Sequence, residues 1–288
     1  MRSLNALSLL SRLERKPQEH KGDAGKVLLI GGAPGMAGAI LLSAYGSLYS
    51  GAGWTIVGML DPRSAHALTQ QPELMIQDIS QQVDLKGWIS SIKPDCIAIG
   101  PGLGQDEKAL ELLIAAIEYP VPLVIDADAL NILANSSALQ DKLRDRQAPF
   151  SLTPHPGEAA RLLNTSSDWV QANRLIALQS LIKRYPGNVI LKGHHTLLGS
   201  PSHEFFECQE GNPGMASGGM GDVLTGIIAA LTAQGIRHNL DLWEATCLGV
   251  QLHAKGADTL VHSGIGPIGL TAIELAKEVR HLLNRHLP

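Results

Sequence analysis

The sequence predicts a single α/β domain built as a three-layer α/β/α sandwich, with a mostly parallel central sheet and an antiparallel edge near residues 195–208. Short apolar runs typical of buried strands alternate along the chain with segments of helical periodicity. Glycine-rich turns follow many of these runs, as in βαβ units with parallel strands. No linker-like stretch, shift in composition or internal repeat divides the chain, so we expect one domain over residues 1–288.

The first part of the chain shows this alternation clearly. Residues 3–15 predict an amphipathic helix that Pro17 ends, because leucines recur on one side. The run Lys26–Ile30 predicts a buried strand, and its glycine-rich turn leads into a helix and then the strand Trp54–Val57. The next expected elements are a helix at 61–71, a strand at Glu73–Ile76, a helix at Asp84–Ile92, a strand at Asp95–Ile99 and a helix at 106–118.

The same order continues to the end of the chain. Pro122–Ile125 and Phe150–Leu152 predict strands, and two helices lie between them. A short helix and a longer one from about Asp168 to Arg184 precede the strand Val189–Leu191. The antiparallel edge is expected at residues 197–198 and Glu204–Glu207, and three helices follow: one that Ser217 could cap and Gly235 ends, one at 240–260 and one at 269–286.

Composition excludes several classes of protein. With 44% hydrophobic and 17% charged residues the chain is globular, and its net charge of −4 without a basic cluster argues against a nucleic-acid partner. No apolar run reaches the ~18 residues that a membrane span needs. Three widely separated cysteines indicate a reducing compartment, and the N-terminus lacks the features of a signal peptide. We therefore expect a cytoplasmic protein with no membrane contact.

The stretch Gly211–Gly226 is the strongest functional signal in the chain. Its crowded glycines open a loop, and an apolar series at helical spacing follows them. Such a loop at a helix start gathers free backbone N–H groups in front of the positive end of the helix dipole, which favours an anion. Asp222 falls in the first helical turn, where it could act as a helix cap or face the bound anion.

Asp222 is better explained as a catalytic acid–base group than as a cap. Ser217 is available for capping, and a cap needs no preceding run of glycines. The stretch lacks the lysine of a P-loop and the third glycine of a dinucleotide-binding turn. An acid in place of that lysine suits a base that takes a proton from a hydroxyl while amides stabilise the charge on phosphate.

Other polar motifs follow predicted strands, at residues 31–38, 100–104, 126–131, 153–158 and 192–196. Ligands of open α/β sheets bind at the carboxyl ends of strands, so we expect these motifs to converge. Each motif has a structural alternative. The glycine turns that include Ala39 and Gly104 could bind a phosphate or only pack tightly, and Asp126 and Asp128 could hold a metal or cap a helix, which suits Asp128 in particular.

The remaining motifs have alternatives of the same kind. His155 lies between two prolines that fix its backbone, which suits a substrate contact or a passive loop residue. Glu158 could order Mg²⁺ through water or stabilise the first turn of a helix. Lys192 and Thr196 could contact a nucleotide phosphate or form a simple turn. Together the residues predict a nucleotide site beside a second pocket, with Asp222 as the acid–base group, and do not identify the substrate.

Four motifs resemble those of the NAD(P)H-hydrate dehydratases, which belong to the ribokinase-like superfamily. The resemblance runs in order from about Lys26 to about Ala276, and the glycine-rich segment Gly218–Gly226 carries most of its specificity. The other motifs are Asp95-x-x-x-x-Gly100-Pro101-Gly102-Leu103-Gly104, Asp126-Ala127-Asp128-Ala129-Leu130 and Thr153-Pro154-His155-Pro156-Gly157-Glu158.

The resemblance implies a repair enzyme that uses ADP and Mg²⁺. It would dehydrate the S epimer of hydrated NADH or NADPH (NADHX, NADPHX), and ADP would yield AMP and phosphate. Asp222 matches the catalytic base. The positions that match hydrate contacts are Ala39, Gly104, His155 and Asp222, and those that match adenine-nucleotide contacts are Lys192, Gly193, His194, His195, Thr196 and Gly221. No metal ligand is assigned beyond Glu158, which could act through water.

The chain departs from its relatives in two respects. Ribokinase-type kinases often carry Asn-x-x-Glu near their Mg²⁺ site, whereas this chain has His155-x-x-Glu158, which favours the dehydratase branch. Many relatives carry an N-terminal epimerase domain, and Lys26 already begins the first core strand, so we expect no epimerase domain and a separate epimerase partner. The resemblance also makes a homotetramer the expected assembly. Two alternatives stay open: a small-molecule kinase similar to hydroxyethylthiazole kinase, and a nucleotide sensor without turnover.

Overall fold

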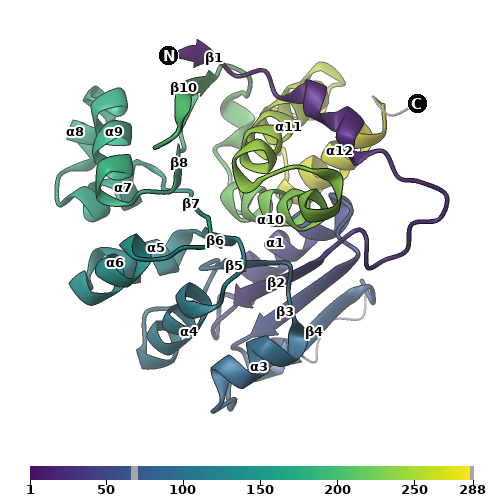
Figure 1. Ribbon diagram of the computed structural model, residues 1–288. Helices are drawn as coiled ribbons and strands as arrows, with labels where there is room; N and C mark the ends of the chain where they lie inside the picture. Colours follow the sequence, from purple (N-terminus) through teal and green to yellow (C-terminus); the bar gives the residue numbers. More distant parts are fainter. Residues whose placement is uncertain (66–70, 286–288) are drawn as a thin grey trace.

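A computed structural model describes residues 1–65 and 71–285. Within these residues ten strands form one sheet in the order β1-β10-β9-β8-β7-β6-β5-β2-β3-β4 (Figure 1). All adjacent pairs in the run β8-β7-β6-β5-β2-β3-β4 are parallel, while β9 is antiparallel to both β8 and β10. The short β1 pairs in parallel with β10 and forms the outer edge. The expected mostly parallel sheet with an antiparallel edge is confirmed.

The elements have the following bounds. The strands are β1 Arg2–Ser3, β2 Lys26–Gly31, β3 Trp54–Met59, β4 Leu74–Asp78, β5 Cys96–Ile99, β6 Leu123–Ile125, β7 Phe150–Leu152, β8 Asn188–Leu191, β9 Thr196–Ser200 and β10 His203–Cys208. The helices are η1 Leu7–Leu13, α1 Ala37–Tyr49, α2 Pro62–Ala65, α3 Leu85–Ile92, α4 Glu107–Glu118, α5 Ala127–Ala134, α6 Ser137–Arg144, α7 Pro156–Leu163, α8 Ser167–Ala172, α9 Arg174–Arg184, η2 Pro213–Met215, α10 Met220–His238, α11 Leu242–His262 and α12 Ala272–Arg285.

Helices cover both faces of the sheet. Helices α1, α10, α11 and α12 lie on one face and α3 to α9 on the other (Figure 1). Side chains alternate along each strand. In β2, Val27 and Leu29 therefore join the core under α1 and α10, while Leu28 and Ile30 join the opposite core. Burial on both faces explains the continuous apolar runs in the sequence and confirms the three layers.

Glycines let α1 and α10 approach at the level of their backbones. A Cβ atom at Gly226 would lie 1.8 Å from the carbonyl oxygen of Ser43, and one at Gly46 would lie 2.4 Å from that of Val223. No residue other than glycine fits such a contact without displacing a backbone. The first turn of α10 is thereby fixed against α1.

The N-terminal segment differs from the expected helix over residues 3–15. Backbone pairing decides its start, because the amide of Leu4 donates to the carbonyl of Glu207 and draws β1 onto β10. Only Leu7–Leu13 is helical, as a 3₁₀ helix, and Leu10 and Leu13 are buried in the core. The leucine spacing indicated the buried side correctly, but the pairing of β1 with β10 overrides the helical propensity of the first residues.

Three other helix predictions need correction. The helix expected from Asp168 to Arg184 is broken at Asn173, where φ is −130°, into α8 and α9. Gly235 does not end α10, which continues to His238. A Cβ atom at Gly235 would lie 2.4 Å from the carbonyl oxygen of Leu240, so the glycine serves this close contact. Ser217 is not its N-cap, which is Gly219 in the left-handed region at φ 89°. Of the helix expected at 61–71 the structure describes α2, Pro62–Ala65, and residues 66–70 lie outside the described residues. The last residue of the helix expected at 269–286 also lies outside them.

Two expectations from composition can be compared with the structure. All three cysteines, Cys96, Cys208 and Cys247, are free and buried, as expected for small apolar core residues. Within residues 1–65 and 71–285, no helix combines the length and the apolar character that crossing a bilayer requires.

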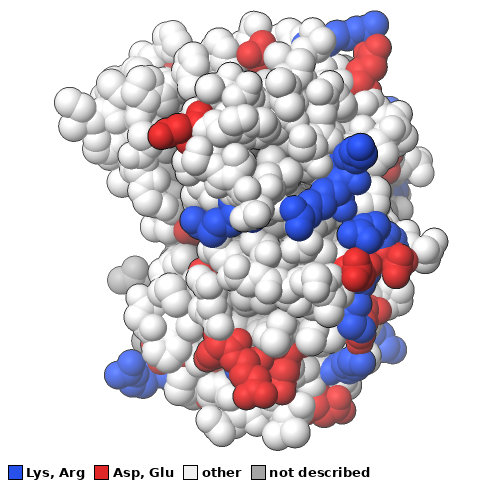
Figure 2. Space-filling model, turned by 90° about the vertical axis from the view of Figure 1, so that its left-hand side faces the viewer, with Lys and Arg blue, Asp and Glu red and all other residues white. Residues whose placement is uncertain are grey.

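The face that carries α5 to α9 is notched at mid-height, with basic side chains at the level of the notch and acidic ones gathered below (Figure 2).

Candidate active site at the carboxyl edge of the sheet

The loops that follow five parallel strands meet at one edge of the sheet. Hydrogen bonds from Gly32 N to Pro101 O (3.1 Å) and from Ala33 N to Gly102 O (2.6 Å) join the loops after β2 and β5. The amide of Lys192 donates to the carbonyl of Pro154 at 2.9 Å and joins the loops after β7 and β8. The motifs therefore converge, as parallel pairing requires.

The N-terminus of α10 faces this edge and carries Asp222 in its first turn. The Asp222 carboxylate accepts no hydrogen bond from another residue in the described part of the chain. Burial raises its pKa to about 6, and the nearby charge of Asp126 acts in the same direction while Lys192 opposes both. A carboxylate without a partner and with a pKa near neutrality suits proton abstraction from a bound hydroxyl.

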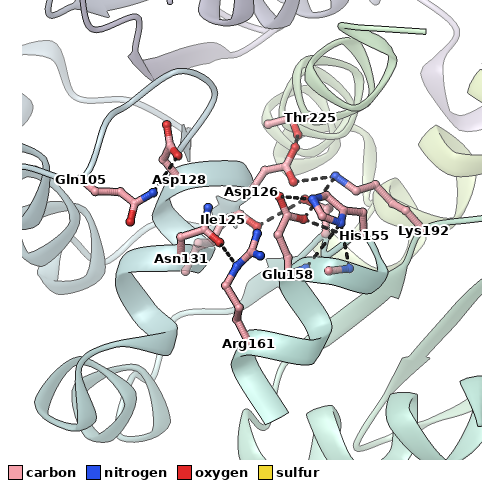
Figure 3. A network of polar contacts seen from close by, with 12 residues as sticks. Gln105, Ile125, Asp126, Asp128, Asn131, His155, Glu158, Arg161, Lys192 and Thr225 are labelled. Carbon is pink, nitrogen blue, oxygen red and sulfur yellow. Dashed lines mark hydrogen bonds and ion pairs between the residues drawn. The ribbon is translucent and has the colours of Figure 1, made fainter. Parts of the chain in front are cut away.

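Lys192 lies beside this turn in a partly buried ion pair with Asp126 (Figure 3). Its Nζ donates to Asp126 Oδ1 at 2.8 Å and lies 4.0 Å from Glu158 Oε2. A Cβ atom at Gly221 would lie only 3.2 Å from that Nζ. Burial alone would lower the pKa of Lys192, but the two carboxylates outweigh burial and raise it. The ammonium therefore stays charged next to the positive end of the helix dipole, where an anion would be stabilised.

His155 and Glu158 form a capping box at the start of α7. The Nδ1 atom of His155 accepts from Gly157 N at 2.9 Å, and Glu158 Oε2 accepts from His155 N at 2.8 Å. Burial, and then the charge of Lys192, lower the pKa of His155. The imidazole is therefore neutral near pH 7, and 49% of its side chain is exposed to a ligand. The capping box, and not the flanking prolines alone, fixes this ring.

The Glu158 carboxylate is held largely by His155. Its Oε1 lies 3.2 Å from His155 Nε2, while Oε2 receives the His155 amide. Burial raises the pKa of Glu158 to about 7, against the lowering effect of Lys192. The first-turn role considered for Glu158 is present, because its side chain completes the capping box of α7. In the described part of the chain no group of three or more His, Cys, Asp or Glu side chains is arranged to hold a metal ion.

Neither Asp126 nor Asp128 makes the helix-capping hydrogen bond considered for it. Asp126 occupies the N-cap position of α5 without a capping hydrogen bond, and its carboxylate binds Lys192 and the hydroxyl of Thr225 instead. Asp128 does not cap a helix, because its Oδ2 accepts from the amide of Gly104 at 3.0 Å. Both carboxylates join strand-end loops to one another, a long-range role that local sequence does not reveal.

The residues expected to bind the adenine nucleotide lie in two places. Gly221 and Lys192 are neighbours at the start of α10, whereas Gly193, His194 and His195 form the loop between β8 and β9, and Thr196 begins β9. The rings of His194 and His195 stack at 4.0 Å, and His195 Nδ1 lies 3.3 Å from Glu207 Oε1. Both imidazoles of this loop are therefore engaged in contacts within the protein.

Ser43 links the expected substrate contact Ala39 to Asp222. Its hydroxyl lies 2.8 Å from the carbonyl oxygen of Asp222 and 3.4 Å from that of Ala39. His253 of α11 supports the same turn, because its Nε2 lies 2.9 Å from the carbonyl of Met220, and burial lowers its pKa to about 4. Sequence reasoning missed Ser43, His253 and Thr225, since nothing in their local spacing distinguishes them from core residues.

Comparison with known proteins decides the family. The family model described as NAD(P)H-hydrate dehydratase matches residues 27–280. This chain belongs to the NAD(P)H-hydrate dehydratase family. The ADP-dependent (S)-NAD(P)H-hydrate dehydratase of Neisseria meningitidis is 36% identical over 277 residues, which cover 94% of this chain and 89% of that protein. The resemblance inferred from the four motifs is thus confirmed.

Two further relatives bear on the extent of the match. A bifunctional NAD(P)H-hydrate repair enzyme of Coxiella burnetii is 40% identical over 271 residues, which cover 94% of this chain and 53% of that protein. This member of the dehydratase family therefore spans about half the length of that relative. The ADP/ATP-dependent NAD(P)H-hydrate dehydratase of Bacillus subtilis, co-crystallised with ATP and Mg²⁺, has a TM-score of 0.84 at 26% identity, covering 99% and 98% of the two chains. The ribokinase-like fold is confirmed.

Proposed function

We propose that this chain catalyses the ADP-dependent dehydration of the S epimers of NADHX and NADPHX, restoring NADH and NADPH and releasing AMP and phosphate. One observation carries the proposal: Asp222, with a pKa raised to about 6, follows Gly221, whose backbone lies against the Lys192 ammonium. A base and an anion site thus share one helical turn. Membership of the dehydratase family and similarity to the N. meningitidis enzyme support the proposal.

In the proposed reaction Asp222 takes the proton of the hydrate hydroxyl. The hydroxyl oxygen forms a bond to the β-phosphorus of ADP, and the bond from that phosphorus to AMP breaks. The amide of Gly221 and the ammonium of Lys192 hold the charge that develops on the phosphoryl oxygens. The lone pair of the ring nitrogen then expels phosphate, and loss of a proton from the adjacent ring carbon restores the double bond.

The proposed substrate contacts are Ala39 in the first turn of α1, Gly104 and His155 in the loops after β5 and β7, and Asp222. The proposed nucleotide contacts are Lys192, Gly193, His194, His195, Thr196 and Gly221. Two findings support this division: Ser43 connects Ala39 to the Asp222 turn, and Asp128 fixes the amide of Gly104 at the same edge. The neutral, half-exposed imidazole of His155 is suited to a hydrogen bond with a sugar or an amide.

Magnesium fits this site as an ion carried by the nucleotide. Mg²⁺ keeps several waters and is commonly bound by phosphates with one or two carboxylates, so it needs no cluster of protein ligands. Glu158 would reach it through water, since His155 occupies its oxygens. When bound, the ion would neutralise charge on the phosphates. The B. subtilis relative was co-crystallised with ATP and Mg²⁺.

Several finer assignments remain part of the proposal. We propose that the chain works together with an NAD(P)HX epimerase; it covers 53% of the bifunctional C. burnetii relative. A homotetramer and a cytoplasmic location are our further predictions. Sedimentation and localisation of the tagged protein would test them.

One assay tests the proposed activity. Purified protein is supplied with ADP, Mg²⁺ and hydrated NADH, and the absorbance of the reduced ring is followed together with phosphate release. Recovery of NADH in step with phosphate is the expected result. A lasting phosphorylated product would instead identify a small-molecule kinase, and ADP binding without product would identify a sensor.

A further inference from the structure

Arg174, the first residue of α9, holds the backbone of the β8–β9 loop. Its Nη2 donates to the carbonyls of Leu191 and His195, each at 3.1 Å, and its Nη1 donates to that of Lys192 at 3.3 Å. The hydroxyl of Thr196 donates to the carbonyl of Gly193 at 3.1 Å. The carbonyl oxygens of residues 191–193 and 195 thereby accept hydrogen bonds from side chains of the protein.

The amides of the same loop are left for a ligand. No hydrogen bond between described residues uses the N–H groups of Gly193, His194 or His195. Gly193 and His194 are exposed, and both Gly193 (φ 139°) and His195 (φ 54°) have positive φ. Successive amides that point to one side form a concave anion site in many proteins. Three successive amides without a partner among the described residues are therefore available to an anion in this loop, which directly follows Lys192.

Arg174 and Gly193 fit together closely. A Cβ atom at Gly193 would lie 2.6 Å from Nη1 of Arg174, so the glycine lets the loop lie directly on the guanidinium. A guanidinium offers five donors in a fixed plane and can serve several carbonyls at once, whereas the ammonium of lysine cannot reproduce that arrangement. The contact is therefore specific for arginine.

We propose that Arg174 is a positioning residue for the phosphate groups of ADP: by holding the carbonyls of Leu191, Lys192 and His195 inward, it turns the amides of residues 193–195 toward the nucleotide. The inference rests on the proposed function, since it takes ADP as the ligand of this loop. Arg174 itself contacts neither the hydrate nor the reacting atoms, and it acts only through the loop.

The chain offers a matched control in Arg146. This guanidinium also donates to several backbone carbonyls, including Tyr119 O at 2.8 Å and Ala116 O at 3.4 Å. Burial lowers the pKa of both arginines, so substitution removes a comparable group in each case. Arg146 serves the turn after α4, however, and no contact joins it to the loop of residues 191–196 in the described part of the chain.

The test compares Arg174→Met, Arg174→Lys and Arg146→Met in the full chain. The Kd for ADP is measured by calorimetry, the KM for hydrated NADH and kcat at saturating ADP by absorbance, and the folded fraction by circular dichroism. We expect Arg174→Met to raise the Kd for ADP by about ten- to a hundredfold, with kcat and the KM for the hydrate unchanged. Arg174→Lys should give an intermediate Kd, and Arg146→Met a wild-type Kd.

Each outcome decides the inference. A wild-type Kd in Arg174→Lys, or equal increases in Arg174→Met and Arg146→Met, would overturn it. Loss of kcat with an unchanged Kd would also overturn it. If the wild-type chain binds ADP without dehydrating the hydrate, the proposed function fails, while the Kd values still decide the role of Arg174. If the wild-type chain does not bind ADP, both proposals fail.

Discussion

The ammonium of Lys192 lies 2.8 Å from Oδ1 of Asp126, and this ion pair joins the ends of β8 and β6. The other carboxylate oxygen of Asp126 accepts from Thr225 of α10 at 2.7 Å. One buried carboxylate thus ties the lysine to the helix that carries Asp222. The cation beside Gly221 is held in place before any ligand arrives, which reduces the entropic cost of binding.

Asp126→Asn should destabilise the fold more than Thr225→Val does. Asparagine keeps the shape but removes the charge, so the nearest carboxylate to Lys192 becomes Glu158 at 4.0 Å. We expect the free energy of unfolding in urea to fall by about 3–5 kcal/mol. Thr225→Val removes one donor to the same carboxylate and should cost about 1.5–3 kcal/mol. A smaller loss in Asp126→Asn than in Thr225→Val would contradict the importance of the ion pair.

Asp222→Asn should lower turnover of hydrated NADH by about 10²–10⁴-fold, the usual effect of losing a general base. The affinity for ADP should change far less, because the amide of Gly221 and Lys192 remain. Steady-state turnover and calorimetry measure the two quantities. Asp84→Asn, which removes a carboxylate charge at the N-cap of α3 after the outermost strand β4, serves as the control and should keep wild-type turnover. Unchanged turnover in Asp222→Asn would exclude the residue from this role.

Activity should fall in acid as Asp222 becomes protonated. Its pKa is raised from 3.8 to about 6, and only the ionised form accepts a proton, so kcat/KM should be constant above pH 6 and drop about tenfold per unit below it. Asp126 is second to burial in raising this pKa, so Asp126→Asn should move the acid limb to lower pH.

Glu158 is the competing explanation for such a limb, because its pKa is raised to about 7. The pH profile of Glu158→Gln distinguishes the two carboxylates. We expect its acid limb to stay near pH 6, as in the wild type. Disappearance of the limb in Glu158→Gln would assign the titration to Glu158.

His253 should make the fold sensitive to acid. Its pKa is lowered from 6.5 to about 4 by burial, so the unfolded chain takes up a proton at a higher pH than the folded one. The stability from the neutral ring is complete above pH 6.5 and is lost as pH falls toward 4. Glutamine does not titrate, so the difference in unfolding free energy between the wild type and His253→Gln should change by roughly 3 kcal/mol over this window.

Urea denaturation at several pH values measures this change. His281→Gln alters an exposed histidine of α12 and serves as the control. A constant difference between the wild type and His253→Gln from pH 7 to pH 4 would show that His253 is not a buried neutral base.

The sequence predicted the parts of this molecule that local pattern encodes. Apolar runs located the strands of the parallel sheet, and glycine turns after them located the edge at which the loops converge. Local pattern could not predict that Asp126 binds Thr225 or that His253 contacts the carbonyl of Met220, because the residues of each pair lie far apart in the sequence. The break at Asn173 was missed for a similar reason: it lets Arg174 start a new helix behind the β8–β9 loop.

The glycine contact between α1 and α10 has a consequence for how this enzyme can vary. With Gly226 and Gly46 pressed against the opposite backbones, α10 cannot slide or roll without separating the two helices. The position of the Asp222 carboxylate at the start of α10 therefore depends on a contact between two helices inside the core. A side chain added at Gly226 or Gly46 would push the two helices apart and move the turn that carries Asp222.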